Sequence, residues 1–329
     1  MSGRIDELNT WLQEETGLED FRMEPASEDA SFRRYFRVYA GESSRIVMDA
    51  PPDKESCDEF IEIARRLRKA GVNAPEILQH DQKRGFLLLG DLGSRQYLQI
   101  IDNNNADELY RDAINALLRM QSRCETRGLP PYDEALLRSE MMLFNDWLVQ
   151  RHIGYSFSKD ELQTFEELHE LLVAAALEQP RVFVHRDYHS RNLMYVAGNN
   201  PGVLDFQDAV AGPVTYDIVS LLKDCYIKWP RENIDSWLDR FVNGSPVLEP
   251  GTSSEKIRRW FDLMGVQRHL KASGIFCRLY HRDGKIGYLK DIPRTLGYII
   301  DLRPDYPELE PLCQFIESVV LAELEQVAG

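Results

Sequence analysis

Residues 181–206, RVFVHRDYHSRNLMYVAGNNPGVLDF, contain the stretch from which the fold can be read. The run 181–184 is apolar and strand-like, and a polar loop follows it. Two further short apolar runs, 193–196 and 203–206, are separated by a turn with Gly and Pro, which predicts a hairpin. The polar side chains are therefore expected on a loop and at a strand end, where neighbouring strands can hold them rigidly.

The polar loop carries a motif with fixed spacing. His185, Arg186, Asp187 and Asn192 occupy the four fixed positions of H-R-D-x-x-x-x-N, the catalytic-loop signature of kinases. Asp205 begins an Asp-Phe pair thirteen residues after Asn192, where a metal-binding carboxylate is needed. The order and the spacing make a chance match rare, and they point to phosphoryl transfer.

Each of these residue types suits a step of that chemistry. We interpret Asp187 as the group that accepts a hydrogen bond from the attacking hydroxyl and takes its proton. A carboxylate with a pKa of about 4 is a weak base, so we expect orientation to be its first task and proton uptake to come late. The oxygens of Asn192 and Asp205 are the hard ligands that Mg²⁺ prefers, and a bound Mg²⁺ spreads phosphate charge.

Other residues near the motif leave two interpretations open. His185 and His189 could ligate a metal, as in some hydrolases, or they could bond to the loop backbone and hold Asp187, which we favour. Asp217 could be catalytic, but a structural tie at the start of a helix is the favoured interpretation.

Composition narrows the possible partners. The chain has 329 residues, of which 43% are hydrophobic and 28% are charged, as in a folded globular protein. Its net charge of −15 disfavours binding to nucleic acid or to an acidic membrane surface. The five cysteines fit neither a disulfide framework nor a zinc pattern, and the N-terminus lacks an apolar signal core. We therefore expect free thiols and a cytoplasmic location.

The order of predicted elements suggests two domains. Strands are expected over 31–39, 45–48 and 85–91, with a helix between the last two that begins with a capping box at Ser56 and Glu59. Later segments are mainly helical. They include 107–122 and a helix capped by Ser158 with Leu162, Phe165, Leu168 and Leu172 on its inner face. We predict an α+β protein with a small mixed N-terminal domain, 1–90, that contains an antiparallel sheet, and a larger helical domain, 91–329.

Residues 185–193 followed by 203–206 resemble the aminoglycoside phosphotransferase family of small-molecule kinases, in which His189 is a hallmark. The resemblance implies a two-lobed protein-kinase-like fold that binds ATP and Mg²⁺, with Asp187 as catalytic base and Asn192 and Asp205 as metal ligands. Within this family, residues 30–37, 47–52 and 204–209 resemble the anomeric N-acetylmuramate/N-acetylglucosamine kinases of bacterial cell-wall recycling. That subgroup phosphorylates the C1 hydroxyl of the sugar and yields the α-1-phosphate.

The resemblance also implies a nucleotide site, although the sequence departs from the family there. The expected phosphate-covering loop, 27–32, has no glycine, and Met48 stands where the family places its phosphate-pairing lysine. Glu59 or Glu62, the usual partner of that lysine, would then face solvent, and Arg33 or Arg34 could supply the missing charge. The residues expected to bind nucleotide are Ser31, Phe32, Arg33, Gly90, Asp91 and Leu92.

The acceptor is expected to be a small anionic sugar. Gly212 and Pro213 follow Asp205 closely and no Ala-Pro-Glu is present, so the long segment with which protein kinases bind peptides is lacking. Residues 256–294 contain ten basic and three acidic residues, a local charge of +7 that suits the lactyl carboxylate of N-acetylmuramate better than a cationic aminoglycoside. The alternative is a basic helix face that pairs with acidic neighbours.

Several residues are candidates for contact with this acceptor. Arg268, Lys271, Arg278 and Arg282 are spaced to share a helix face. We expect Arg278, His281 and Arg282 to contact the acid group, and Asp208 to lie near the substrate. For Trp229, Trp237 and Trp260, core packing is favoured over stacking on a sugar.

Competing functions remain open at this point. The chain could phosphorylate another small hydroxyl substrate, such as an amino sugar, an aminoglycoside or an amino alcohol, or it could be a nucleotide-binding pseudokinase that acts as a scaffold. A metal hydrolase that uses His185, Asp187 and His189 is a third possibility. The missing lysine favours the pseudokinase, whereas the complete set of Asp187, Asn192 and Asp205 opposes it.

Overall fold

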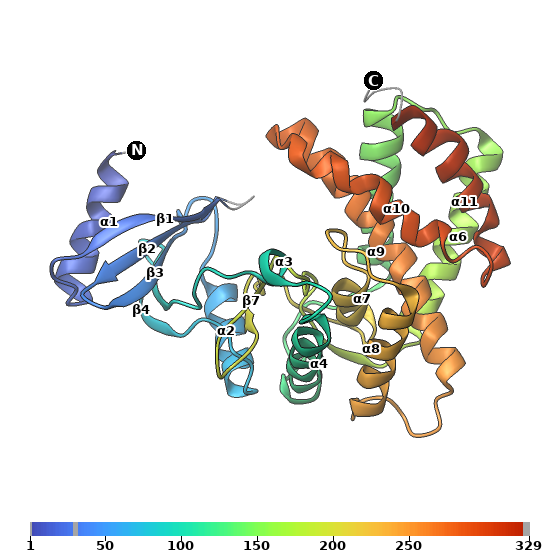
Figure 1. Ribbon diagram of the computed structural model, residues 1–329. Coiled ribbons are helices and arrows are strands. Elements are labelled where there is room, and N and C mark those ends of the chain that lie inside the picture. The colour runs from blue at the N-terminus through green and yellow to red at the C-terminus, as the bar shows by residue number, and fades with distance from the viewer. Residues whose placement is uncertain (1, 29–31, 325–329) are drawn as a thin grey trace. The chain divides into compact units, whose positions relative to one another are not determined.

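The computed structural model describes residues 2–28 and 32–324, and the chain forms two compact units (Figure 1). The first unit comprises Met1–Ile100 and Arg191–Asp208, and the second comprises Ile101–Ser190 and Ala209–Gly329. The catalytic-loop segment therefore leaves the second unit after Ser190. The division of the chain into domains 1–90 and 91–329 stays a prediction.

A five-stranded antiparallel sheet with the strand order β1-β2-β3-β5-β4 forms the centre of the first unit. A separate two-stranded hairpin belongs to the same unit. The elements are α1 (Ser2–Glu15), β1 (Arg22–Glu28), β2 (Arg34–Ala40), β3 (Ser43–Asp49), α2 (Asp58–Lys69), β4 (Ile77–Asp81), β5 (Phe86–Gly90), α3 (Tyr97–Ile100), β7 (Leu193–Met194) and β8 (Gly202–Val203). The predicted antiparallel sheet is confirmed.

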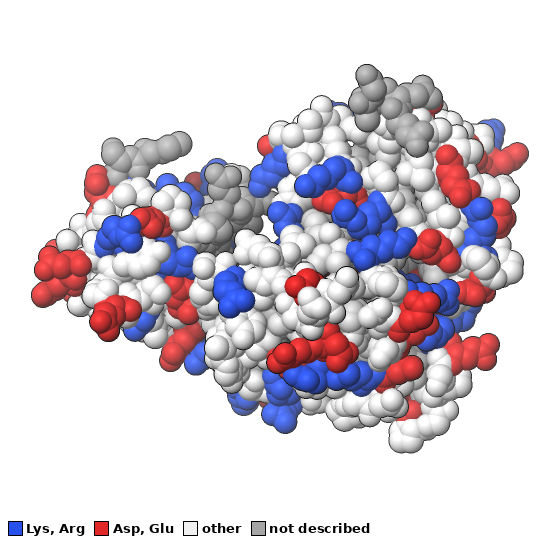
Figure 2. All heavy atoms as spheres, viewed as in Figure 1, with Lys and Arg blue, Asp and Glu red and all other residues white. Residues whose placement is uncertain are grey.

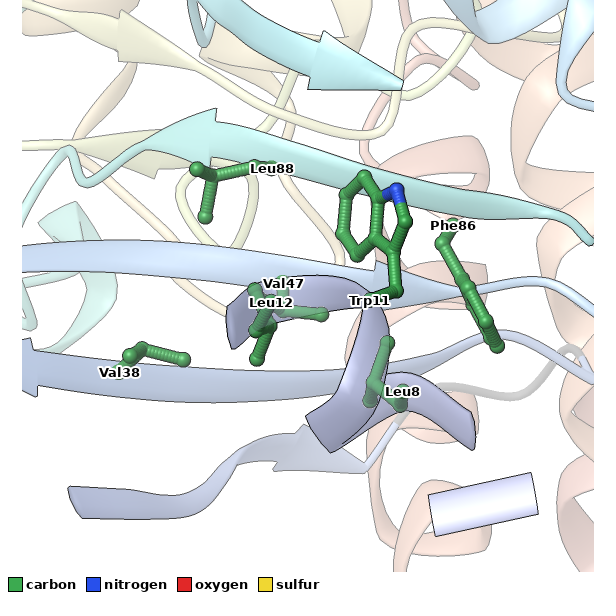
Figure 3. Packing of buried hydrophobic residues seen from close by; sticks show 7 residues of the cluster. All are labelled: Leu8, Trp11, Leu12, Val38, Val47, Phe86 and Leu88. Carbon is green, nitrogen blue, oxygen red and sulfur yellow. The ribbon is translucent and has the colours of Figure 1, made fainter. Parts of the chain in front are cut away.

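Helix α1 packs on one face of this sheet (Figure 3). Its apolar residues are three or four positions apart, so they share one helix face and meet the residues that β2, β3 and β5 direct to the same side. The seven core residues, each at most 5% exposed, are Leu8, Trp11, Leu12, Val38, Val47, Phe86 and Leu88. Burial of each large side chain contributes about 1.5–3 kcal/mol, so α1 is held to the sheet mainly by apolar packing.

The start of α2 differs from the prediction. The helix begins at Asp58 with Cys57 as its N-cap residue, and no side-chain hydrogen bond caps it. The Ser56 hydroxyl accepts a hydrogen bond from the Asp58 N–H at 2.9 Å, so Ser56 forms a short turn before the helix and not the predicted capping box with Glu59. Phe60 and Leu67 of this helix are buried.

Helices dominate the second unit, which also contains one two-stranded antiparallel sheet, β6-β9. The segments are α4 (Ala106–Arg123), α5 (Glu134–Leu143), π-helix η1 (Phe144–His152), α6 (Lys159–Leu177), β6 (Arg181–Val184), β9 (Val210–Pro213), α7 (Tyr216–Leu222), α8 (Arg231–Gly244), α9 (Ser254–Asp283), 3₁₀-helix η2 (Ile286–Asp291), α10 (Ile292–Ile300), 3₁₀-helix η3 (Pro307–Leu309), α11 (Glu310–Phe315) and π-helix η4 (Ile316–Leu321).

The long helix α9 is central to this unit and packs against α5, η1, α6, α7 and α10. Its close approach to the junction of α5 and η1 requires a glycine. A Cβ atom at Gly274 would lie 2.2 Å from the carbonyl carbon of Leu143, a distance that no side chain tolerates. The sequence therefore permits α9 and α5 to touch along their backbones, and this contact brings side chains of the two helices together near the catalytic loop.

Two other predictions concern this unit. The capping box of α6 is confirmed, because Ser158 accepts from the Glu161 N–H and Glu161 accepts from the Ser158 N–H. Leu162 was wrongly placed on the inner face and is 49% exposed, because the first turn of α6 extends past the core that buries Phe165 and Leu172. The three tryptophans assigned to packing are buried as expected: Trp229, Trp237 and Trp260.

All five cysteines are buried as free thiols: Cys57, Cys124, Cys225, Cys277 and Cys313. Burial raises the pKa of Cys57 and of Cys225 to about 11 and that of Cys277 to about 12, so these thiols stay protonated at neutral pH. Within the described residues, no helix combines the length and the apolar character that spanning a membrane would require.

Candidate active site

Asp217, near the start of α7, anchors the first two residues of the catalytic loop. Its carboxylate accepts hydrogen bonds from the backbone N–H of His185 at 2.7 Å and of Arg186 at 3.0 Å. The residue is fully buried, and burial raises its pKa to about 7 although both N–H groups act in the opposite direction. The interpretation of Asp217 as a structural tie is confirmed.

His185 also holds the loop. Its ring is fully buried, and its Nδ1 accepts a hydrogen bond from the Asp187 backbone N–H at 3.2 Å. The backbone N–H of His189 donates to the Asp187 carbonyl oxygen at 3.0 Å, while the His189 ring contacts the Tyr226 ring at 5.4 Å. The described residues include no group of three or more His, Cys, Asp or Glu side chains that could hold a metal ion.

Asp224, two residues beyond α7, is a third anchor. One oxygen of this buried carboxylate accepts from the Ser190 backbone N–H at 2.9 Å, and the other accepts from the Tyr226 N–H at 2.8 Å. Because Asp217 holds the beginning of the loop and Asp224 holds Ser190, the backbone on both sides of Asp187 is fixed.

The surroundings of Asp187 keep its carboxylate ionised. Burial acts to raise its pKa, but the charges of Lys271, His189 and Arg268 outweigh this and leave the pKa below its ordinary value. At neutral pH, Asp187 is therefore an anion that can accept a hydrogen bond from a hydroxyl group. This state fits the predicted role in orientation, which itself stays a prediction.

The preceding residue, Arg186, is unusual in its backbone and in its partner. Its φ angle of +78° lies in the left-handed region, where residues other than glycine are rare. Its guanidinium pairs with Glu140 of α5, a buried carboxylate that also pairs with Lys271 of α9 at 2.8 Å. Sequence reasoning missed Glu140. The available signal was a lone carboxylate beside Met141, and both residues are buried in α5.

The predicted metal ligands, Asn192 and Asp205, belong to the first unit together with Asp208. The Asn192 amide donates to Asp205 Oδ2 at 3.2 Å, and Gln207 donates to Asp205 Oδ1 at 2.9 Å. Strand β8 ends at Val203, so Asp205, which the predicted strand 203–206 included, lies beyond the observed strand and has a left-handed φ of +62°.

The chemistry of this pair fits a hard cation. The amide and the carboxylate are adjacent, Asp205 is exposed, and both side chains offer oxygen atoms. Asp208 is exposed three residues further along the chain.

Two of the described residues assigned to nucleotide binding, Phe32 and Arg33, meet the same carboxylate. The Phe32 backbone N–H donates to Glu55 Oε1 at 2.9 Å, and Arg33 Nε pairs with Glu55 Oε2 at 2.7 Å. The Phe32 side chain is 63% exposed. Ser31 lies outside the described residues.

The other assigned positions are the last residue of β5, Gly90, and the two residues after it. The Gly90 N–H donates to the Glu76 carbonyl at 2.8 Å. Asp91 accepts from Arg37 at 2.7 and 3.1 Å and from the Gly93 N–H at 2.9 Å. Burial acts to raise the pKa of Asp91, but the Arg37 guanidinium holds it below its ordinary value. Leu92 packs close to Gly202, where an added Cβ would lie 2.9 Å from the leucine Cδ1.

The position expected for a phosphate-pairing lysine is apolar in the structure as well. Met48 is fully buried in β3, where it pairs with Tyr35 and Leu87 of the neighbouring strands. Arg34 pairs with the buried Asp49. Glu59 and Glu62 are exposed, as expected for residues without a lysine partner.

The three residues assigned to the acid group of the acceptor lie at or near the end of α9. The His281 ring nitrogen Nε2 is 3.1 Å from Nδ1 of His152 in η1, and Arg282 pairs with Asp283 at 2.8 Å. Arg278 is half-buried, and its Nε has no hydrogen-bond partner among residues 2–28 and 32–324. Arg278 is therefore the most available cation of this set.

Much of the basic segment pairs with acidic neighbours, as the alternative interpretation expected. Arg258 pairs with Asp235 at 2.6 Å, and Arg259 pairs with Glu308 at 2.7 Å. Figure 2 shows lysine and arginine side chains next to acidic ones over much of the visible face. Two candidates are buried: Lys271 pairs with Glu140, and Arg268 donates to the Ser220 hydroxyl.

The chain is similar in sequence to known kinases. The model of the phosphotransferase enzyme family (APH) matches residues 22–254. An N-acetylmuramate/N-acetylglucosamine kinase of Pseudomonas aeruginosa is 47% identical over 331 residues, which cover 96% of this chain and 97% of that protein. A protein of the same name from Pseudomonas putida is 47% identical over 333 residues, which cover 96% of each chain.

Solved structures resemble the whole fold. The crystal structure of choline kinase LicA from Streptococcus pneumoniae matches with a TM-score of 0.64 and 13% sequence identity, covering 89% of this chain and 98% of that one. At this identity the likeness concerns the fold alone. It confirms the predicted α+β fold of the protein-kinase type.

Proposed function

The chain belongs to the phosphotransferase enzyme family, and from this premise we propose that it is an ATP- and Mg²⁺-dependent sugar kinase. The membership confirms the family predicted from the catalytic-loop motif. We propose N-acetylmuramate, N-acetylglucosamine or both as acceptors and the C1 hydroxyl as the site of transfer, with the sugar α-1-phosphate as product. The pathway would be the recycling of peptidoglycan sugars in the cytoplasm.

One observation carries the proposal. Kinases named for these two sugars are 47% identical to this chain over nearly its full length, so the similarity includes the helical unit as well as the nucleotide-binding region. Fold similarity alone would not choose an acceptor, because one fold serves many substrates. The C1 position rests on the resemblance of residues 30–37, 47–52 and 204–209 to the anomeric kinases.

In the proposed mechanism Asp187 orients the sugar hydroxyl. Its pKa lies below the ordinary value, so the carboxylate is anionic and accepts the hydroxyl hydrogen bond at neutral pH. The oxygen of that hydroxyl attacks the terminal phosphorus of ATP, the bond to the ADP oxygen breaks, and the proton passes to Asp187 late in the step. The anchored loop supplies positioning, which is the main requirement of a loose transition state.

Asn192 and Asp205 would hold Mg²⁺ through one amide oxygen and one carboxylate oxygen. When bound, the ion neutralises phosphate charge. The Gln207 amide supports the carboxylate from its other side, and this bond limits the orientations that Asp205 can adopt. Nucleotide would contact Phe32, Arg33 and the residues after β5.

The acceptor site would extend along α9. Lys271, whose charge acts on Asp187, and Arg278 are seven residues apart, so they share a helix face and lie about 10 Å apart along the axis. Helical side chains lean towards the N-terminus, which directs Arg278 back towards the Asp187 end. A sugar with its C1 hydroxyl at Asp187 could thus direct an acidic substituent towards Arg278, with His281, Arg282 and Asp208 as further candidates.

A panel of acceptors with analysis of the phosphate position tests the proposal. The purified protein is incubated with ATP, Mg²⁺ and N-acetylmuramate, N-acetylglucosamine, choline or an aminoglycoside, and the products are identified by ³¹P and ¹H NMR. We expect an α-1-phosphate from the first two sugars. Phosphate at another hydroxyl would exclude the anomeric assignment, and turnover of choline or the aminoglycoside alone would exclude a sugar acceptor.

One observation favours a second candidate, a nucleotide-binding protein without transfer activity. Met48 is buried in β3 where the family has a phosphate-pairing lysine, and Arg33 and Arg34 pair with carboxylates. The same panel separates the candidates. Nucleotide binding without product from any acceptor would favour the second candidate and exclude the first.

A further inference from the structure

A buried cluster of charged and polar side chains lies behind the catalytic loop. At its centre, Glu140 of α5 accepts from the Arg186 guanidinium and from the Lys271 ammonium, which is 2.8 Å away. Its second oxygen, Oε2, accepts from the Tyr132 hydroxyl and, at 3.3 Å, from the Gln267 amide. One carboxylate thus connects the loop with α9 and with the chain before α5.

The partners of Glu140 are themselves fixed. Lys271 donates to the Tyr216 hydroxyl at 2.9 Å, and Gln267 donates to the Tyr132 hydroxyl at 3.2 Å. Glu140 is 4% exposed, while Tyr216 and Gln267 are fully buried. Burial acts to raise the pKa of Glu140, but Lys271 and Arg186 outweigh it and lower the pKa to about 2. The carboxylate is therefore a permanent anion between two cations.

The contact with Glu140 holds a residue, Arg186, whose backbone conformation is strained. Arg186 has a φ of +78°, a conformation that costs a residue with a Cβ atom free energy and persists only when its surroundings determine it. Asp217 holds the backbone N–H of Arg186, and Glu140 holds its side chain. The φ and ψ angles of Arg186 set the direction in which the chain enters Asp187, so an error at Arg186 displaces the next carboxylate.

We propose that Glu140 is a positioning residue for phosphoryl transfer: by pairing with Arg186 it keeps the left-handed backbone that aims Asp187 at the acceptor hydroxyl. This inference rests on the proposed role of Asp187. Glu140 is 4% exposed, so we assign it no contact with substrate. Its effect reaches the reaction through its two cationic partners, chiefly through Arg186 next to Asp187, and a variant should therefore change the rate of transfer and leave the binding of both substrates nearly unchanged.

The principal test replaces the charge and keeps the shape. In Glu140→Gln, Arg186 and Lys271 lose their anion, the loop relaxes, and we expect kcat to fall about 10- to 100-fold with both KM values within threefold of wild type. A folded Glu140→Gln protein with kcat within threefold of wild type would overturn the proposal.

A second variant tests the path through Arg186. Glycine adopts a positive φ without strain, so Arg186→Gly should keep the backbone without any side-chain anchor. Whatever Arg186→Gly itself costs, we expect Glu140→Gln to lower kcat much less in that background than in wild type, because the contact that it removes is already absent. An equal loss in both backgrounds would show that Glu140 acts elsewhere. If Glu140→Gln alone does not fold, the kcat of Arg186→Gly is compared with that of the double variant. Similar values support the proposal, and a much lower value for the double variant contradicts it.

Asp262 offers a matched control. It is a buried carboxylate in α9 that pairs with Lys223 at 2.7 Å and accepts from the Tyr306 hydroxyl at 2.8 Å, so it shares a lysine and a tyrosine partner with Glu140 but has no partner in the loop among the contacts described. Asp262→Asn should lower the melting temperature as Glu140→Gln does, yet keep kcat near that of wild type. An equal fall of kcat in the two variants would reduce Glu140 to a structural role.

The same assays separate this inference from the proposed function. No phosphorylated sugar from the wild-type protein would contradict the proposed function itself. An active wild type with an equally active, folded Glu140→Gln variant contradicts only the inference about Glu140.

Discussion

The catalytic loop and the end of α9 are built in opposite ways. The loop from His185 to Ser190 is tied by three buried carboxylates that accept from its backbone or from its arginine. The cations near the end of α9 are half-buried or exposed, and the acidic partner of Arg282 within the described part of the chain is its neighbour in the sequence, Asp283. The difference indicates that the part proposed to perform chemistry is fixed in advance, whereas the part proposed to recognise the acceptor can adjust.

This contrast makes a general prediction about variants. Changes in the loop should lower kcat for every acceptor, because they disturb the group that aligns the hydroxyl. Changes at the end of α9 should alter KM for an acceptor with a carboxylate and leave a neutral sugar nearly unaffected. The experiments below proceed from the largest expected effect to the smallest.

Asp187→Asn should have the largest effect. The amide keeps the size of the side chain but cannot take the proton, so we expect kcat to fall about 10²- to 10⁴-fold for both sugars. Nucleotide affinity should stay within a few-fold of wild type. Product formation followed by NMR and nucleotide binding followed by calorimetry measure the two quantities. More than a tenth of wild-type turnover would remove Asp187 from its role.

Asp217→Asn should weaken the loop less severely. The two backbone N–H groups bond to different oxygens of Asp217, and in asparagine an NH₂ donor replaces one of these acceptors. One hydrogen bond is therefore lost, and we expect a loss of kcat of about tenfold, measured with each sugar at saturation. Unchanged kcat in a folded variant would show that the loop keeps its conformation without this anchor.

Asp217 also predicts a pH dependence of stability. Its folded-state pKa of about 7 lies above the value of about 3.9 in an unfolded chain, so the folded protein binds an extra proton between these values. The stability that this group contributes is therefore present below pH 4 and is lost as the pH rises through 7. Urea unfolding at pH 5 and pH 7.5 should show that the wild type loses more stability over this interval than Asp217→Asn.

Arg278→Ala tests whether the end of α9 recognises the acceptor. A hydrogen bond between charged groups is worth about 1.5–3 kcal/mol, so its removal should raise KM for N-acetylmuramate roughly 10- to 100-fold. KM for N-acetylglucosamine, which lacks the lactyl group, should change less than threefold, and kcat should hold for both. Equal increases for the two sugars would argue against a carboxylate contact at Arg278.

His281→Gln should have the smallest effect. Burial and the charge of Arg151 lower the pKa of His281, and burial lowers that of His152, so both rings are neutral at pH 7.5. We expect KM for both sugars to stay within threefold of wild type at this pH. At a pH below this lowered pKa, a charged imidazole should give the wild type a modest advantage over the variant for the anionic sugar. The ratio of the KM of His281→Gln to that of the wild type, measured with N-acetylmuramate at pH 7.5 and 5.5, tests this expectation.

The contrast between the two regions also explains what the sequence could predict. His185, Arg186, Asp187 and Asn192 lie within eight consecutive positions, so their spacing is visible without a structure. Their anchors are distant in the chain: Glu140 is 46 residues from Arg186, and Asp224 is 34 residues from Ser190. No local pattern reports such contacts, because they depend on how helices pack.

Predictions of the fold were likewise limited to features that depend on residues close together in the sequence. The α6 capping box was predicted correctly because its partners are three residues apart. Leu162 was misplaced because helical periodicity identifies a face and cannot show how far along the helix the core extends. Lys271 stood out as part of a basic segment, but the charge pattern could not reveal a buried partner on another helix.

The buried cysteines allow unfolding of the native chain to be followed by chemical labelling. Cys57 is the single cysteine of the first unit, and the other four belong to the second. Because a covered thiol reacts with an alkylating reagent only after its surroundings open, the labelling rate of Cys57 follows opening of the sheet unit, and the remaining rates follow the helical unit. Mass spectrometry after timed alkylation could thus establish whether the two units open together, without any engineered probe.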